Sequence, residues 1–231
     1  MCVNWSYIPV LVWLTMTSQL ARLFTTLKNS QYIPNPGHEQ YIKTVLINKG
    51  WMHYTPPKSK QNVRRTVESI SDDEMPTMSF IYQPFGSQRS PDFILKDDGG
   101  RVEQLEAKSS TMDFPMYNSG GVNPDYLYVF CSKTTDTTTI YRGSDIITPE
   151  QQAVIDAHIE DARQRDEEVN RKLHEMDINL RGIAYYTRPM IIQAGGKEFK
   201  NYFKHGNQGA CEQGLLNWVE GDKLAESSGF P

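Results

Sequence analysis

Two carboxylates and a lysine lie close together in this chain, in a pattern that suits the chemistry of phosphate esters. Asp92 opens a short apolar run, and Glu106 and Lys108 lie in a second run beyond an Asp-Asp-Gly-Gly turn. If the two runs are strands of one hairpin, alternation places Gln104, Glu106 and Lys108 on one face. The apolar residues between them then point to the opposite face, into a core. The sequence therefore predicts that Asp92, Glu106 and Lys108 meet at one position.

This set of side chains provides what a divalent cation and a phosphodiester require. Carboxylate and carbonyl oxygens are the ligands that Mg²⁺ prefers in proteins. A bound divalent cation can lower the pKa of a water ligand and stabilise the charge that develops on an attacked phosphate. Lys108 beside such an ion could hold the phosphate or help to activate the water. The competing interpretation is an ordinary hairpin whose charged residues face solvent.

The pair Pro91–Asp92 and the triplet Glu106–Ala107–Lys108 resemble the motif of the PD-(D/E)xK nuclease superfamily, whose best-known members are type II restriction endonucleases. The resemblance implies that Asp92 and Glu106 bind Mg²⁺ and that the backbone carbonyl of Ala107 completes the metal shell. It implies that Lys108 acts in catalysis. It also implies a restriction-endonuclease-like core, in which a central mixed β-sheet is flanked by helices.

Two more side chains are candidates for the same site. Members of the superfamily often carry a further acid on the helix before the core sheet, and Glu39 lies at the corresponding place. A glutamate near the start of a helix is also an ordinary partner of the helix dipole. Gln104 is a candidate because it shares the charged face of its strand. The resemblance covers about residues 37–142, and a second Pro-Asp pair there, Pro124–Asp125, has no acid-x-Lys triplet after it in range.

Apolar periodicity and turn signals predict the elements that must position these residues. Apolar residues at helical spacing predict helices, and alternating or β-branched apolar runs predict strands. A run of strands between helices predicts an α/β or α+β fold in one domain. The expected helices cover residues 19–29, 38–49 and 148–176, and the expected strands cover residues 78–85, 92–96, 101–109, 126–132, 137–142, 183–186 and 190–193.

The helix expected at 148–176 carries an apolar stripe and an acidic outer face. The stripe consists of Val154, Ile155, His158, Ile159 and Ala162. We expect His158 to pack within this stripe rather than to take part in catalysis. The helix could supply a homodimer surface, which would match a two-fold symmetric DNA site. The acidic face makes the same helix a poor DNA contact.

Three polar segments and one arginine are candidates for DNA contacts. Lys and Arg contact phosphates or guanine, and Asn and Gln contact adenine. The segments are a basic connection near residue 60, the loop after the 101–109 strand, and a carboxy-terminal recognition region of about residues 195–231. For each segment the alternative is an ordinary solvated loop. The candidates are Lys58, Lys60, Arg64, Arg65, Arg89, Asn118, Ser119, Asn123, Lys200, Lys204, His205, Asn207 and Gln208.

Composition limits the class of protein. With 231 residues, of which 38% are hydrophobic, the chain is neither disordered nor collagen-like. Its 3 cysteines are far apart and form no CxxC pair, which argues against a disulfide scaffold and a structural zinc site. The net charge is −4, yet residues 1–65 are strongly basic and the centre is acidic. A basic flank beside an acidic centre suits a metal site that must also hold a polyanion.

The first 15 residues need an interpretation of their own, because they are apolar and uncharged. Polar residues interrupt this stretch and no basic segment precedes it, which argues against a membrane or export segment. Two interpretations stay open: an amino-terminal extension, or a start assigned upstream of a true start at Met16. We expect residues 16–231 to form a single nuclease domain.

Together these observations predict a Mg²⁺-dependent, site-specific endonuclease for double-stranded DNA, of the type II restriction kind. We expect a cytoplasmic protein or, if virus-encoded, one that acts inside the host cell, with no membrane association. We expect it to act as a homodimer and to have a cognate DNA methyltransferase as its functional partner. Two alternatives stay open: a structure-selective repair or resolvase nuclease of the same superfamily, and a non-catalytic nucleic-acid-binding or interaction domain.

Overall fold

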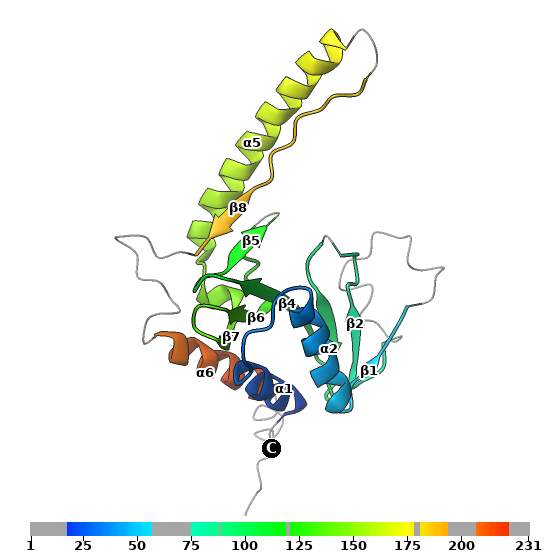
Figure 1. Ribbon diagram of the computed structural model, residues 1–231, viewed down its shortest axis with the longest axis vertical. Coiled ribbons are helices and arrows are strands. Elements are labelled where there is room, and N and C mark those ends of the chain that lie inside the picture. The colour runs from blue at the N-terminus through cyan, green and yellow to red at the C-terminus, as the bar shows by residue number, and fades with distance from the viewer. Residues whose placement is uncertain are drawn as a thin grey trace, which may run out of the picture.

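A mixed β-sheet forms the centre of the part of the chain that the structure describes (Figure 1). The computed structural model describes residues 18–56, 75–87, 89–118, 121–177, 181–193 and 207–221. Within these ranges the sheet has 6 strands in the order β1-β2-β3-β4-β6-β7. Their bounds are Met52–His53, Ser79–Tyr82, Phe93–Lys96, Val102–Ser110, Leu127–Ser132 and Thr137–Arg142.

The sheet is mixed, because it contains both parallel and antiparallel pairs of strands. β1 runs parallel to β2, and β4 runs parallel to β6. The pairs β2–β3, β3–β4 and β6–β7 are antiparallel. Helices flank the sheet, as described below, so the prediction of an α/β fold with a central mixed sheet is confirmed.

The β3–β4 hairpin forms as the sequence predicts. Its ladder pairs Phe93 with Leu105 and Lys96 with Val102. The turn is closed by the carboxylate of Asp97, whose Oδ1 accepts hydrogen bonds from the backbone N–H groups of Gly99 and Arg101, both at 2.9 Å. These bonds fix the register of the hairpin, and the register decides which side chains of β4 share a face.

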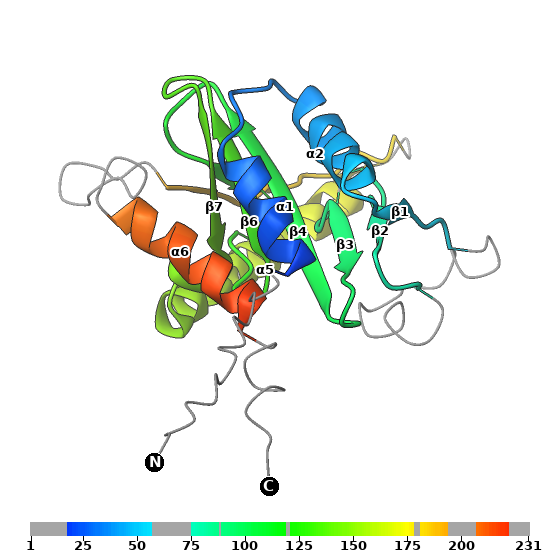
Figure 2. The same cartoon turned by 90° about the horizontal axis from the view of Figure 1, so that it is seen from below.

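Three helices cover one face of the sheet (Figure 2). They are α1 (Gln19–Lys28), α2 (Gly37–Asn48) and α6 (Asn207–Glu220). The main core lies between these helices and the sheet, and it includes Phe93, Leu105 and Ala107 from the hairpin. Helix α6 was not expected from the sequence. Only Leu215 and Val219 of this helix are buried, and its internal glycines weaken the helical signal.

The opposite face of the sheet carries a second, aromatic core. Tyr117, Tyr128 and Tyr141 are almost completely buried there, and the hydroxyl groups of Tyr117 and Tyr141 are 2.8 Å apart. Tyr117 belongs to β5 (Met116–Asn118), which pairs antiparallel with β8 (Met190–Ile192). This two-stranded ribbon lies between the main sheet and the projecting part of the long helix α5 (Pro149–Met176), which follows β7 in the chain.

Helix α5 projects away from the sheet, and the segment that follows it returns alongside (Figure 1). The helix is capped by Thr148, whose side chain accepts a hydrogen bond from the N–H of Gln151. None of its residues is fully buried, and the expectation that His158 packs in an apolar interior is wrong, because this side chain is exposed. Ile155 of its apolar stripe packs against the aromatic core, and the returning segment lies along the stripe farther out.

One other expectation differs from the structure, and two lie outside the part of the chain that it describes. Residues 183–186 are not a strand, since the returning segment becomes extended and paired only at β8. Residues 1–15 lie outside the described part of the chain. So do eight of the candidate DNA contacts: Lys58, Lys60, Arg64, Arg65, Ser119, Lys200, Lys204 and His205.

Candidate active site

The structure brings both Asp92 and Lys108 into contact with Glu106. The β3–β4 ladder ends at the pair Phe93–Leu105. By the same register, Asp92 lies opposite Glu106, just beyond the last paired residues. The carboxylate of Asp92 accepts a hydrogen bond from the N–H of Ala107 at 2.9 Å through Oδ2. The N–H of Asp92 donates to Glu106 Oε2 at 3.2 Å. The Nζ of Lys108 lies 2.5 Å from Glu106 Oε1.

Glu39 reaches the same place from helix α2. The preceding residue, His38, is buried, and its Nε2 lies 3.3 Å from the carbonyl oxygen of Val129, which anchors the first turn of α2 over the sheet. Burial lowers the pKa of His38 to about 4. Glu39 Oε2 accepts hydrogen bonds from the hydroxyl of Tyr82 at 2.8 Å and from the side-chain amide of Gln83 at 3.3 Å.

These side chains line a cavity of about 260 Å³, which we call the acidic cavity. Its walls include Glu39, Asp92, Glu106, Ala107 and Lys108. The predicted group of residues is therefore assembled at one end of the sheet by two strands and one helix. Its walls carry three carboxylates together with serine hydroxyls and asparagine amides, and carboxylate oxygens are ligands that a hard divalent cation prefers.

Negative charge at this position is only partly compensated. Burial, the charge of Glu106 and the charge of Glu39 raise the pKa of Asp92 to about 7, against the lowering effects of the Ala107 hydrogen bond and of Lys108. The pKa of Tyr82 is raised to about 12, by burial and by its contact with Glu39. A cation placed among these carboxylates would be stabilised by the same field.

The donor atoms at this site fit a cation in number and kind when a backbone group is included. In the described part of the chain, no group of three or more His, Cys, Asp or Glu side chains is arranged to hold a metal ion. Asp92 and Glu106 supply two carboxylates. The third ligand proposed by the resemblance is the carbonyl of Ala107. A strand residue directs its N–H and C=O to the same side, and the N–H of Ala107 bonds Asp92, so this carbonyl lies on the Asp92 side as well.

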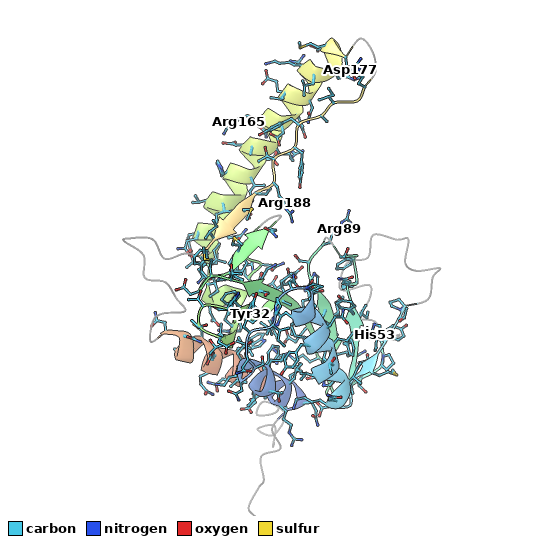
Figure 3. The ribbon with its side chains drawn as sticks, in the orientation of Figure 1. Tyr32, His53, Arg89, Arg165, Asp177 and Arg188 are labelled. Atoms are coloured by element: carbon cyan, nitrogen blue, oxygen red, sulfur yellow. The ribbon has the colours of Figure 1, made fainter. Side chains whose placement is uncertain are left out.

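Two arginines lie at the rim of the acidic cavity. Arg89 belongs to the loop before β3 and Arg188 to the returning segment before β8, and both side chains are exposed. Figure 3 shows Arg188 on the segment beside α5 and Arg89 on the β2–β3 side. Arg89 was a predicted DNA contact. Arg188 was missed, because no motif surrounds it and only the return of the chain along α5 brings it to the site.

A second cavity, of about 530 Å³, adjoins the acidic cavity and shares Arg89, Ser90, Glu106, Lys108 and Asn118 with it. We call it the α5 cavity, because it extends from these shared residues to the first turns of α5. Another predicted DNA contact, Asn123, lines it too. Thus Asn118 and Asn123 both lie beside the predicted catalytic residues.

Three other candidates are not brought to either cavity. Gln104 shares the face of Glu106 but lines neither of them. Asn207 and Gln208 begin helix α6, which packs on β7 and α1. The amide of Gln208 donates to Glu212 Oε1 at 3.1 Å and lines a small hollow at the β6–β7 hairpin. Any DNA contact by Asn207 or Gln208 would therefore be remote from Asp92.

Comparisons with known proteins identify no relative. No protein-family model matches the chain, and neither a curated protein nor a solved structure matches it. Among the described helices, none is long and apolar enough to cross a membrane.

Proposed function

We propose that this protein is a Mg²⁺-dependent endonuclease for double-stranded DNA, with a restriction-endonuclease-like core. The observation that carries the proposal is the contact of Asp92, Glu106 and Lys108 in one cavity, where the pKa of Asp92 is raised to about 7. Strongly perturbed carboxylates in a cleft are typical of functional sites. Two arginines at the rim of the same cavity supply the positive charge that a polyanion needs.

Each side chain has a distinct part in this proposal. Asp92, Glu106 and the carbonyl of Ala107 would hold the ion, which when bound would activate water and stabilise charge on the phosphate. Lys108 lies against Glu106 and would hold a phosphate oxygen or orient the attacking water. The hydrogen bond from Ala107 N–H fixes the Asp92 carboxylate in place before substrate arrives.

Positive charge beyond the reacting centre would hold the DNA backbone. Arg89 and Arg188 line the same cavity from two different segments of the chain, which suits contacts to phosphates next to the scissile one. We further propose that the enzyme reads a specific site as a homodimer, with a cognate methyltransferase protecting the host's own sites. A structure-selective nuclease of the same superfamily is the second candidate, because it would use the same residues.

The test is incubation of the purified protein with unmethylated phage DNA, with Mg²⁺ and separately with EDTA. Discrete bands that require Mg²⁺ support a site-specific endonuclease, and a smear supports a nuclease that does not read sequence. Asp92→Asn, Glu106→Gln and Lys108→Met should each lower the cleavage rate by about 10²–10⁴-fold. Asp125→Asn is the matched control, since Asp125 is an exposed acid that also follows a proline.

Two outcomes would reject the proposal. Wild-type cleavage in all three variants would show that these residues do not carry the reaction. Absence of cleavage by a folded protein, on linear, supercoiled and branched DNA alike, would favour the non-catalytic binding domain. Circular dichroism of each variant separates loss of activity from loss of fold.

A further inference from the structure

The α5 cavity has two chemically different ends. Its shared end contains Arg89 and Lys108 and opens onto the predicted reaction site. Its far end is lined by Asn123, Tyr126, Gln152 and other residues of the β5–β6 connection and α5. Among the described residues at the far end there is no lysine or arginine, and the charged side chain there is Asp156. A phosphate is therefore disfavoured at the far end, whereas an uncharged group with hydrogen-bond donors is favoured.

Two side chains of α5 offer hydrogen-bond acceptors to such a group. Gln152 and Asp156 are one helical turn apart, and the amide Nε2 of Gln152 donates to Asp156 Oδ1 at 2.6 Å. This bond uses one of the two N–H donors of the Gln152 amide and orients both groups. The Oε1 atom of Gln152 is buried and has no hydrogen-bond partner among the described residues. A buried acceptor without a partner is unfavourable, and a donor on a ligand held against this wall would satisfy it.

The opposite wall is rigid and aromatic. Asn123 is held by its backbone N–H, which donates to the hydroxyl of Tyr128 at 2.9 Å, and by its side-chain oxygen, which accepts from the N–H of Asp125 at 3.0 Å. Gly143 packs tightly against the backbone of Asn123, since a Cβ at this position would lie 1.8 Å from the carbonyl oxygen of Asn123. The half-buried ring of Tyr126 lines the cavity beside Asn123. Planar apolar surface with fixed polar groups is typical of sites that hold a heteroaromatic ring.

We propose that the far end of the α5 cavity binds one nucleobase, from a nucleotide next to the scissile phosphate, and that it selects a base with an exocyclic amino group. This inference rests on the proposed function for the identity of the polymer. The volume of about 530 Å³ lies within the range of small-ligand sites. Carboxylate and amide oxygens accept hydrogen bonds from the amino groups of cytosine, adenine or guanine, whereas thymine has no such group. The base reaches the cavity unstacked, at a cost of a few kcal/mol.

Nucleotide binding tests the cavity without any cleavage. The wild-type protein is titrated in the presence of Mg²⁺ with the monophosphates of deoxycytidine, deoxyadenosine, deoxyguanosine and thymidine, and with deoxyribose 5-phosphate, by calorimetry and saturation-transfer NMR. We expect about tenfold tighter binding of at least one amino-bearing nucleotide than of thymidine monophosphate or the sugar phosphate. Asp156→Asn turns one acceptor into a donor and should shift the preference toward thymine. Asp161→Asn, which changes an exposed acid elsewhere on α5, should leave the preference unchanged.

Equal affinity for all five ligands, no measurable binding, or the same preference in Asp156→Asn as in the wild type would overturn the proposal. The proposed function is tested separately by cleavage in Asp92→Asn. Selective nucleotide binding without DNA cleavage would leave the base site standing and reject the nuclease. The base site would be rejected, and the nuclease left standing, by two results together. Asp156→Asn would cleave DNA with an unchanged base preference beside the cut, and nucleotide binding would be unselective.

Discussion

Replacement of Asp92 by asparagine should stabilise the metal-free protein at alkaline pH, because this carboxylate is held where its charge is unfavourable. Burial and the charge of Glu106 raise its pKa from 3.8 to about 7. Between these values the folded state keeps a proton that the unfolded chain has lost. The free energy of unfolding therefore falls as the pH rises through this range, and it levels off above about pH 7. Since one pKa unit corresponds to about 1.4 kcal/mol, the limit is about 4 kcal/mol.

Asparagine removes the charge and keeps an oxygen that can accept the hydrogen bond from Ala107 N–H. Relaxation of the carboxylates and entry of water reduce the effect, so we expect Asp92→Asn to be about 1–3 kcal/mol more stable than the wild type at pH 8. At about pH 4, near the unfolded pKa, the two proteins should be almost equally stable. Urea denaturation at both pH values without divalent cations measures the difference.

Mg²⁺ provides a second arm of the same experiment. An ion that binds the folded wild type through Asp92 stabilises it and should reduce the advantage of Asp92→Asn at pH 8. The exposed control Asp125→Asn should show neither effect. If Asp92→Asn were less stable than the wild type at pH 8, or if the difference did not change with pH, the account of the acidic cavity as a site of uncompensated charge would be wrong.

Three further predictions follow from the same geometry. Cleavage at limiting Mg²⁺ should rise about tenfold per pH unit below about pH 7 and then level off, and excess Mg²⁺ should move the midpoint to lower pH, because proton and cation compete for Asp92. Arg188→Ala should weaken DNA binding and lower the slope of log affinity against log salt by about 1, which filter binding at several salt concentrations would detect, whereas Arg165→Ala on the exposed part of α5 should not. Leu105→Ala should lower the free energy of unfolding by about 2–5 kcal/mol in urea denaturation, since Leu105 is fully buried under the helices.

The hairpin and the placement of its charged residues could be predicted because the information is local. Strand alternation assigns Glu106 and Lys108 to one face and Leu105 to the other, and the Asp-Gly turn fixes the register. The position of Asp92 follows from the same register. Glu39 was placed by the resemblance alone, and its hydrogen bond to Tyr82 depends on how α2 packs across the sheet.

The parts that escaped prediction depend on contacts between distant segments. Helix α6 buries only Leu215 and Val219, so its periodicity is weak and its position is decided by α1 and β7. Arg188 reaches the acidic cavity because the chain returns along α5 and β8 pairs with β5. No local sequence pattern predicts which strand β8 pairs with. His158 was misassigned because its stripe has helical spacing, which shows that a helix is amphipathic but not what lies against it.

Strand β4 carries two buried glutamates, one with a structural role and one with a proposed functional role. Glu103 is buried on one side of the strand, and it pairs there with the guanidinium of Arg101 at 2.5 Å and accepts a hydrogen bond from the indole of Trp218 at 3.3 Å. Three residues on, Glu106 is equally buried, but its neighbours are the carboxylate of Asp92 as well as Lys108. Asp92, beside Glu106, forms no ion pair with a described residue, whereas a fold selected for stability alone would give such an acid a cation of its own or replace it with an apolar residue. This hairpin concentrates negative charge beside an open cavity with arginines at its rim, which is the arrangement that the proposed cation and anionic substrate would require.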